Sequence, residues 1–527
     1  MSKDLLSVTT LSLLAAGAGC TFISEADHED RIDGDGDSHA HADYVDGDDC
    51  DDTDPDINPS VEEICDDGVD NNCDETAIGC TLVGEFSLSE APIAMVGQSE
   101  GDQAGTRVTT ANSFTTPDVT DVVVGAPGHG GSGAVYLSTA VKASSSAGSL
   151  GNASLTLVGD EDGDQAGAAV LGFPTSGGGA LLVGAPGYDS DDNQDVGAVF
   201  LVQGPAGGTR SLSGSDSTTA MITETTTKAA LGTALTVGDV DGDEFLDLWI
   251  GAPYTDAAID TVKSKGKSYL WFGPVTGDLD VGSTDLCITG AEKGDHGGSA
   301  VALADLDGDG LDELILGSPD ASPNDLNGSG RVHVLFDATN PDLSIDDADS
   351  SFSGLHVEAG AGSALAVGDT NGDGYEEVLV GAPSAIGSAP ESGAAYLLQG
   401  PWTGSIPDVA QLKGEQTMDQ AGANVTVGDV DADGFDDLII SAPRHDANGD
   451  DAGAVYLVYG PATGTMKLSR KADARMDGSD AGDLAGVGVA VGDIDGNGRQ
   501  DILIGAPGES SVGTESGMFY TMLSKGL

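Results

Sequence analysis

The stretch GDVDGDEFLDLWIGAP, from Gly238 to Pro253, joins a run of alternating carboxylates to a short apolar segment. The apolar residues LWI have the composition of a buried β-strand. The tripeptide that closes the stretch recurs along the chain, about sixty to sixty-seven residues apart. Its seven copies begin at Gly125, Gly184, Gly251, Gly317, Gly381, Ser441 and Gly505. The stretch is therefore one instance of an internal repeat, which must be recognised before the fold is assigned.

Each repeat contains four short runs of apolar or alternating residues. In the third repeat these runs are ALTVGD, DLWI, SYLWFG and LCITG, and none of them has helical periodicity. Four short strands in a unit of about sixty residues indicate one blade of an antiparallel β-propeller. The sequence therefore predicts an all-β fold, a seven-bladed β-propeller of four-stranded antiparallel blades.

The two ends of the repeat region predict how the ring closes. After the seventh tripeptide one further strand follows, GMFYTML, so the last blade needs a fourth strand. The segment IAMVGQSEGDQAG from Ile93 aligns with LTLVGDEDGDQAG from Leu155, which contains the fourth strand of blade one. We expect the strand at Ile93 to complete blade seven, because this pairing leaves no open edge between the ends.

The composition excludes several classes of partner. The chain has 89 acidic and 19 basic residues, for a formal net charge of -70. Nucleic acids and anionic membrane surfaces are poor partners for such a chain, because Lys and Arg must neutralise their phosphates. The chain is nevertheless 39% hydrophobic, and its 80 glycines with only 5% aromatic residues favour tight turns between short strands.

The acidic part of the repeat predicts a metal-binding loop. An EF-hand is excluded, because its sixth position needs Gly and its twelfth Glu, where this loop has Glu244 and Ile250. Counted from the first Asp, positions one, three, five and nine offer side-chain oxygens and position seven offers a backbone carbonyl. Calcium prefers six or more such oxygens. The alternative is an acidic turn without an ion, in which the carboxylates would repel one another.

The pattern occurs in five blades, and blades one and two lack it. Asn at one position lowers the ligand charge in blades five and seven, so weaker binding is expected there. The predicted ligands are Asp239, Asp241, Asp243, Phe245 and Asp247 in blade three; Asp305, Asp307, Asp309, Leu311 and Glu313 in blade four; Asp369, Asn371, Asp373, Tyr375 and Glu377 in blade five; Asp429, Asp431, Asp433, Phe435 and Asp437 in blade six; Asp493, Asp495, Asn497, Arg499 and Asp501 in blade seven.

These features resemble the FG-GAP repeats of the seven-bladed propeller of integrin alpha chains, over about residues 91–527. The resemblance implies that the loops joining the first two strands of a blade bind calcium, at about five sites. It also implies a partner-binding face on the opposite side. Loops that follow the tripeptides would form that face, such as GYDSDDNQDVG (187–197), YTDAAIDTVKSKGK (254–267) and RHDANGDDAG (444–453).

The segment before the propeller is predicted to have three parts. Residues 1–20 resemble a bacterial lipoprotein signal in which Cys20 becomes lipidated; the alternative is an ordinary cleaved signal. Residues 21–45 form an acidic spacer, although Asp33, Asp35, Asp37, His39 and His41 offer cation ligands. Residues 46–80 resemble the metal-binding motif of the MopE type, with a possible further metal. Two disulfides are expected among Cys50, Cys65, Cys73 and Cys80, with three possible connectivities, and residues 81–527 form the propeller.

The sequence offers no convincing catalytic site. GQSEG, residues 97–101, matches the serine-hydrolase elbow but lacks its strand-to-helix context. Asp349, Ser351 and Ser353 fit the D-x-S-x-S of an adhesion site that belongs to an α/β domain.

The leading hypothesis is therefore a non-catalytic, extracellular calcium-binding propeller that mediates adhesion or binds a protein or glycan partner. We expect an outer-membrane or surface lipoprotein, otherwise a secreted protein, that meets the membrane only through its lipid anchor. The alternatives are a secreted hydrolase that uses the propeller channel and a structural protein of the envelope.

Overall fold

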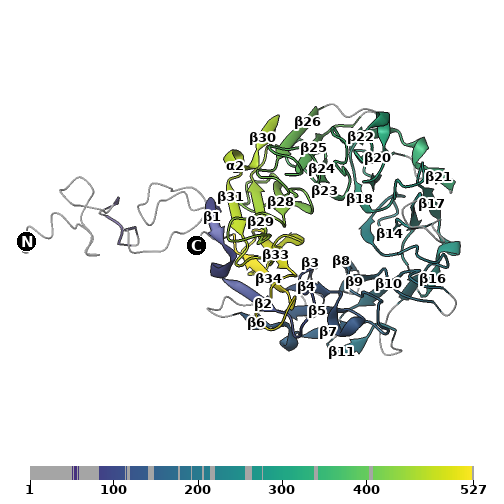
Figure 1. Cartoon of the computed structure of the whole chain (residues 1–527), viewed down its shortest axis with the longest axis horizontal. Helices are drawn as coiled ribbons and strands as arrows, with labels where there is room; N and C mark the ends of the chain where they lie inside the picture. Colours follow the sequence, from purple (N-terminus) through teal and green to yellow (C-terminus); the bar gives the residue numbers. More distant parts are fainter. Residues whose placement is uncertain are drawn as a thin grey trace, which may run out of the picture. The chain divides into compact units, whose positions relative to one another are not determined.

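The computed structural model describes residues 50–51, 53–55, 57–58, 82–112, 114, 119–139, 147–175, 178–190, 193–204, 207–213, 220–255, 264–275, 277–336, 342–402 and 408–524. The chain divides into two units, Met1–Cys80 and Thr81–Leu527. In the described part of the second unit the strands form seven sheets, arranged as the blades of a ring (Figure 1). The predicted lipidation site at Cys20 lies outside the described residues, as do Cys65, Cys73 and Cys80, so lipidation and disulfide pairing stay predictions. No helix in the described residues is both long and apolar enough to span a membrane.

Four strands of each blade pair antiparallel, and the first strand lies nearest the axis, as Figure 1 shows for β3, β8, β18 and β23. The strands of blades one to three, from the axis outward, are β3 (Arg107–Asn112), β4 (Thr120–Ala126), β5 (Ala134–Thr139) and β7 (Leu155–Val158); β8 (Ala169–Thr175), β9 (Gly178–Ala185), β10 (Ala198–Gln203) and β12 (Ala220–Thr223); β13 (Ala234–Gly238), β14 (Asp247–Ala252), β15 (Lys267–Trp271) and β17 (Leu286–Thr289).

Blades four to seven repeat this order. Their strands are β18 (Ala300–Ala304), β19 (Glu313–Ser318), β20 (Arg331–Leu335) and β22 (Ser350–Ser353); β23 (Ala364–Gly368), β24 (Glu377–Ala382), β25 (Ala394–Gln399) and β26 (Asp408–Lys413); β27 (Val425–Gly428), β28 (Asp437–Ala442), β29 (Ala454–Val458) and β31 (Ala474–Asp477); β32 (Gly488–Gly492), β33 (Asp501–Ala506), β34 (Met518–Met522) and β2 (Ile93–Val96).

The ring closes as the sequence predicts. Strand β2 pairs antiparallel with β34, so that Ile93 lies opposite Thr521 and Val96 lies opposite Met518. The first strands of successive blades contact one another around the ring, and β32 of blade seven contacts β3 of blade one. A strand from the beginning of the propeller therefore completes its last blade.

A fifth strand extends six of the seven sheets, which the four-stranded prediction missed. Each fifth strand pairs parallel with the outermost strand of a blade: β11 (Gly208–Ser211), β16 (Leu279–Asp280), β21 (Asp342–Ser344), β30 (Thr465–Lys467), β6 (Gly148–Ser149) and β1 (Gly84–Ser87). Five of these strands come from the connection between the third and fourth strands of the following blade, and β1 precedes β2. They cover outer edges that would otherwise be open. Sequence patterns did not reveal them because they are short and mostly polar.

A single helical turn follows five of these fifth strands. The turns are η1 (Leu88–Glu90), η3 (Leu150–Asn152), η5 (Val281–Ser283), η7 (Ile345–Asp347) and α2 (Leu468–Lys471). The leucine or isoleucine of four of these turns is buried, so the turn anchors the edge strand to the blade.

The second strand of each blade is apolar along its length because both of its faces are covered. In β14, Leu248 and Ile250 pack in a cluster with residues of blade two. Trp249, between them, packs with residues of blade four. The alternation of a β-strand thus sends successive side chains into two different interfaces.

The tripeptide is conserved within the chain because its first residue lies where two blades touch. A Cβ atom on Gly251 would overlap the carbonyl oxygen of Gly298, which belongs to the next blade. The same approach joins blade seven to blade one, where a Cβ on Gly505 would overlap the carbonyl oxygen of Gly105. Glycine is required here for close packing of backbones.

We expect Ile93→Ala to destabilise the propeller strongly, because Ile93 is buried between blades seven and one. Truncation of a buried isoleucine costs about 2–5 kcal/mol. Glu90→Ala, at an exposed residue of η1, is the control and should change stability little. Thermal and urea unfolding measure the effect, and equal stabilities of the two variants would argue against closure through β2.

Candidate metal centres

The five predicted acidic loops each connect the first and second strands of a blade. In blade three the loop runs from Asp239, directly after β13, to Asp247, the first residue of β14. Consecutive strands are antiparallel, so the connections alternate between the two faces of the ring. All five loops therefore lie on one face, and the loops after the tripeptides lie on the other.

The first carboxylate of each loop folds the backbone around itself. In blade three, Asp239 Oδ1 accepts the N–H of Gly242 at 2.8 Å, and its Oδ2 accepts the N–H of Glu244 at 3.0 Å. Blade four shows the same arrangement around Asp305, with Gly308 at 2.7 Å and Gly310 at 3.0 Å. These bonds curl the loop so that later carboxylates return toward the first.

The ninth carboxylate is buried and fixed from two sides. Asp247 Oδ2 accepts the N–H of Val240 at 2.8 Å, and its Oδ1 accepts the N–H of Gly273 at 2.8 Å. Asp437 does the same with Val430 and Gly460, each at 2.9 Å. The first residue of the second strand therefore places a carboxylate under the loop, and backbone N–H groups hold it in position.

The structure brings positions one, three and nine of four loops together. One carboxylate oxygen of each residue lies within 4.8 Å of the other two. The four groups are Asp239, Asp241 and Asp247; Asp305, Asp307 and Glu313; Asp429, Asp431 and Asp437; Asp493, Asp495 and Asp501. Oxygen donors of this kind fit a hard divalent cation such as calcium, whose two positive charges would offset most of the repulsion among three neighbouring carboxylates.

The side chain at the fifth position also accepts a hydrogen bond within its own loop. Asp243 Oδ1 accepts the N–H of Phe245 at 2.9 Å, and Asp433 Oδ1 accepts that of Phe435 at 2.8 Å. Such Asx turns shape the loop locally. Asp309, Asp373 and Asn497 make the equivalent bond to Leu311, Tyr375 and Arg499. The side chain at position five thus sets the loop conformation in this structure.

Blade five differs in the way its sequence suggests. Asn371 replaces the third-position carboxylate, and its Nδ2 donates to Glu377 Oε1 at 2.8 Å. The hydroxyl of Thr370 also donates to Glu377, at 2.8 Å. At positions one, three and nine, blade five thus supplies two carboxylates, Asp369 and Glu377, where each of the other four loops supplies three.

Burial raises the pKa of the ninth carboxylates. Desolvation, with a smaller contribution from the neighbouring Asp residues, raises the pKa of Asp247 to about 6 and that of Asp501 to about 6. The same causes raise the pKa of Asp437 to about 7 and that of Glu313 to about 8. A bound cation would favour the ionised form of each.

A residue that the sequence analysis did not single out links neighbouring loops. Asp312, at position eight of blade four, accepts the N–H of Asp239 in blade three at 2.8 Å. Glu376 of blade five similarly accepts the N–H of Asp305 at 3.1 Å. A signal was present, because position eight is acidic in blades four, five and six. The connected loops form a chain along the face that carries the acidic loops.

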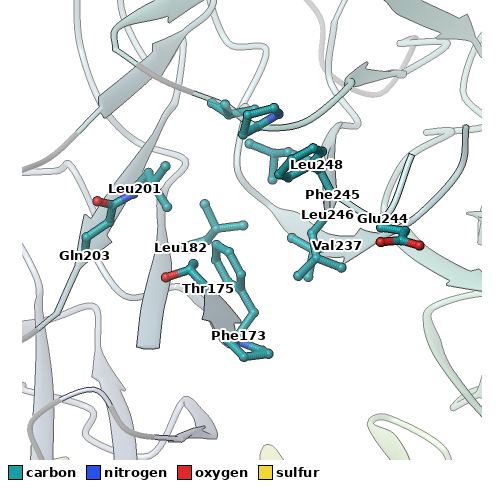
Figure 2. A pocket seen from close by; sticks show the side chains of 13 residues that line it. Phe173, Thr175, Leu182, Leu201, Gln203, Val237, Glu244, Phe245, Leu246 and Leu248 are labelled. Carbon is teal, nitrogen blue, oxygen red and sulfur yellow. The ribbon is translucent and has the colours of Figure 1, made fainter. Parts of the chain in front are cut away.

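That chain is interrupted at blade two, which has no acidic loop. Position eight of blade three is Leu246, and an apolar pocket of about 610 Å³ lies between it and blade two. Figure 2 shows Phe173 and Leu182 on one side of this pocket, and Phe245 and Leu248 on the other. Phe245 is 52% exposed because no preceding loop covers it.

The other candidate motifs occupy structural positions. Ser99 of GQSEG lies in a turn after β2, where its N–H donates to Asp102 at 2.8 Å; Glu161 makes the equivalent bond to Asp164 after β7. Asp349 accepts the N–H of Phe336 at 2.9 Å beside β22. These contacts explain both motifs as parts of the blade repeat.

Comparison with known families identifies the repeat. The FG-GAP repeat family matches residues 231–271, 297–335, 361–398, 421–458 and 485–522, and each matched segment contains one acidic loop. The chain contains FG-GAP repeats. Residues 49–77 match a second family, described as "Putative metal-binding motif".

Curated proteins of two kinds are similar to part of this chain. Integrin alpha pat-2 of Caenorhabditis briggsae is 29% identical over 258 residues, which cover 45% of this chain and 20% of the relative. Integrin alpha-PS2 of Drosophila melanogaster is 31% identical over 41% of this chain and 15% of the relative. Phosphatidylinositol-glycan-specific phospholipase D of Rattus norvegicus is 31% identical over 40% of this chain and 26% of the relative. The FG-GAP region thus spans about a quarter or less of each relative's length.

Ala432→Gly should stabilise the blade-six loop. Ala432 has φ of 60°, where the other four loops have glycine at the same position. The left-handed conformation costs a residue with a Cβ about 1 kcal/mol, part of which glycine loses again through its freer unfolded state. We expect a gain of about 0.5 kcal/mol.

The matched variant is Gly434→Ala in the same loop, where φ is 89° and no atom would crowd the new Cβ. It should destabilise by about 1 kcal/mol. Chemical unfolding compares the two, and shifts of the same sign would contradict the loop conformation.

The buried carboxylates also predict a pH dependence in EDTA. Their pKa values in the folded state lie above the unfolded value of about 4. Their contribution to stability is therefore complete below pH 4 and is lost as the pH rises through about 6 to 8. The melting temperature in EDTA should rise on acidification from pH 8 to pH 6.

Excess calcium should raise the melting temperature at pH 8 and remove this rise, because ligation keeps the carboxylates ionised. Asp437→Asn, which replaces one titrating group with a neutral isostere, should show a smaller rise in EDTA. A melting temperature that EDTA and calcium leave unchanged at pH 8 would contradict metal binding at these loops.

Proposed function

We propose that this protein is an exported, calcium-stabilised propeller that binds a macromolecular partner and catalyses no reaction. The division of labour between its two faces supports the proposal. One face carries the acidic loops, whose carboxylates would hold calcium and stabilise the scaffold. At a free calcium concentration one hundred times the dissociation constant, one such site would stabilise the folded state by about 2.7 kcal/mol. The opposite face, where the loops after the tripeptides lie, is then free for recognition.

Exposed apolar side chains on that opposite face favour a protein partner. Leu355 and Val357 lie between blades four and five, Ile386 lies between the second and third strands of blade five, and Met418 lies between blades five and six; all four are between 50 and 54% exposed. Large apolar residues that stay exposed are typical of interaction surfaces. Their neighbours are polar loops, which gives the mixed composition of a non-obligate interface.

Export and anchoring extend the same proposal. Residues 1–20 have the composition of a secretory signal, and lipidation of Cys20 would attach the propeller to a membrane surface. The MopE-type segment at residues 49–77 would add a second metal-binding element between the anchor and the propeller. The face with the recognition loops would then meet proteins or glycans outside the cell.

A second candidate is a hydrolase, favoured by the similarity to phosphatidylinositol-glycan-specific phospholipases D. The shared region covers 26% of the rat protein. The proposal of a binding propeller is preferred because GQSEG, the candidate hydrolase motif, is a turn that recurs in the blade repeat.

The test uses the full chain with Cys20→Ser, which stays unlipidated. We expect it to bind a purified surface protein or glycan in a screen, more tightly with calcium than with EDTA. Ile386→Asp and Met418→Asp together should weaken binding at least about tenfold, because they place charges in the apolar part of the interface. Val83→Asp introduces the same charge at another exposed apolar residue and should have no effect. Calcium-independent turnover of a phosphodiester substrate would overturn the proposal in favour of the hydrolase.

A further inference from the structure

A pocket of about 280 Å³ lies at the axis of the ring, where the first strands of the blades begin. The acidic loops follow the ends of these strands, so the pocket opens on the opposite face. It is lined mainly by small and aliphatic residues from six of the seven first strands or the turns before them. One lining residue, Arg107, carries a positive charge, in a chain whose formal net charge is -70.

Arg107 is unusual at its position in the repeat. In six blades the register places one residue of the first strand opposite the glycine of the tripeptide, as Arg107 pairs with Gly125. The equivalent residues are Ala169, Ala234, Ala300, Ala364 and Gly488. In blade six the backbone N–H of Ser441 donates to the carbonyl oxygen of Asn424 at 3.0 Å, which places Asn424 at the equivalent position. Six small or short side chains thus leave room at the axis for one long guanidinium side chain.

The hydrogen bonds of Arg107 leave one edge of its guanidinium group available. Its Nη1 donates to the carbonyl oxygens of Thr106 at 3.2 Å and Val487 at 3.5 Å. Within the described residues, its Nε and Nη2 make no hydrogen bond and the side chain forms no ion pair. This edge, with two parallel N–H groups, is the one that binds a carboxylate in a bidentate manner.

The pocket encloses Arg107 only in part. Its side chain keeps some exposure to solvent, and desolvation lowers its pKa below its ordinary value. A carboxylate at the free edge would therefore meet a cation that has lost part of its hydration, where charges interact more strongly than in bulk water. The neighbouring hydroxyls do not compete for an anion as donors. Thr233 donates to Ala230 at 2.7 Å, Ser299 to His296 at 2.7 Å, and Ser363 to Gly360 at 2.6 Å. Arg107 is therefore the group in this pocket that is equipped to hold a negative charge.

We propose that Arg107 binds the carboxylate of an acidic side chain that a protein partner inserts into the axial pocket. This inference rests on the proposed function, because it identifies one contact on the partner-binding face. A glutamate fits the lining well: its methylene groups would lie against Val170, Leu235 and Val301, and its carboxylate would reach the guanidinium. A sugar would fit less well, because its hydroxyl groups would remain unpaired against these aliphatic side chains.

The test uses N-acetylglutamate as the probe and the full chain with Cys20→Ser, labelled with ¹⁵N at the arginine Nε. The Nε–H signal of Arg107 is assigned by its disappearance in Arg107→Lys. N-acetylglutamate should shift this signal saturably, with a dissociation constant in the millimolar range. N-acetylglutamine keeps the α-carboxylate but carries a neutral amide in place of the side-chain carboxylate, so it should shift this signal less at the same concentration. No saturable shift, or an equal shift with both compounds, would overturn the proposal.

Variants extend the test to the partner. Asn424→Asp should weaken binding of the probe. Asn424 Nδ2 and Arg107 donate to the same carbonyl oxygen of Val487, so the new carboxylate would lie close enough to compete for the guanidinium. Arg107→Gln should lower the affinity for a protein partner at least about tenfold, as expected for the loss of charge-assisted hydrogen bonds. Arg210→Gln, which makes the same change of charge on the outer strand β11, should leave both unchanged.

The two proposals fail in different ways. If a partner is found whose affinity is the same with Arg107→Gln as with Arg210→Gln, the propeller binds partners but Arg107 is not the anchor. If N-acetylglutamate binds at Arg107 and no macromolecule is retained in the screen, the site exists and the proposed adhesion function is wrong. Unfolding curves of Arg107→Gln and Arg107→Lys show whether either variant has lost the fold.

Discussion

The close approach of backbones between neighbouring blades is the constraint on which the rest of the structure depends. In six blades the first residue of the tripeptide is a glycine whose Cα lies against a carbonyl oxygen of the next blade. A Cβ atom at this position would overlap that oxygen, so these six blades require glycine. In blade six, Ser441 takes this place, and its Cβ lies beside Gly486. The apolar second strands then pack on both faces, because each is enclosed by two neighbours.

This tight packing determines where charge can be tolerated. The strand that is apolar on both faces begins with a carboxylate, such as Asp247 or Asp437, which is buried under the acidic loop. Backbone N–H groups hold this carboxylate, and two further Asp side chains approach it from above. Position-eight acids such as Asp312 connect one loop to the next. The acidic loops and the strands that pack the blades thus belong to one hydrogen-bonded network.

The seven blades share one backbone arrangement, but their side chains differ from blade to blade. Blade two has no acidic loop, and the apolar residues Phe245 and Leu246 face the space beside it. At the axis, on the face opposite the acidic loops, Arg107 occupies the position that small residues take in the other blades. Such departures from the repeat are where we infer function, because the shared residues maintain the scaffold. Exposed residues such as Ile386 and Met418 belong to the same face as the axial pocket.

The sequence by itself determined the number of blades, the closure through Ile93–Val96 and the five acidic loops, because hydrophobic alternation and repeated turns are local signals. It also identified carboxylates one, three and nine of four loops. Tertiary structure alone decided that position five shapes the turn, as Asp243 does. It also decided that polar segments such as Gly208–Ser211 extend a neighbouring blade, and that Arg107 lies at the axis among shorter residues of the other blades, four of which are alanines. These features depend on pairing between segments far apart in sequence, so the spacing of residues along the chain carries no trace of them.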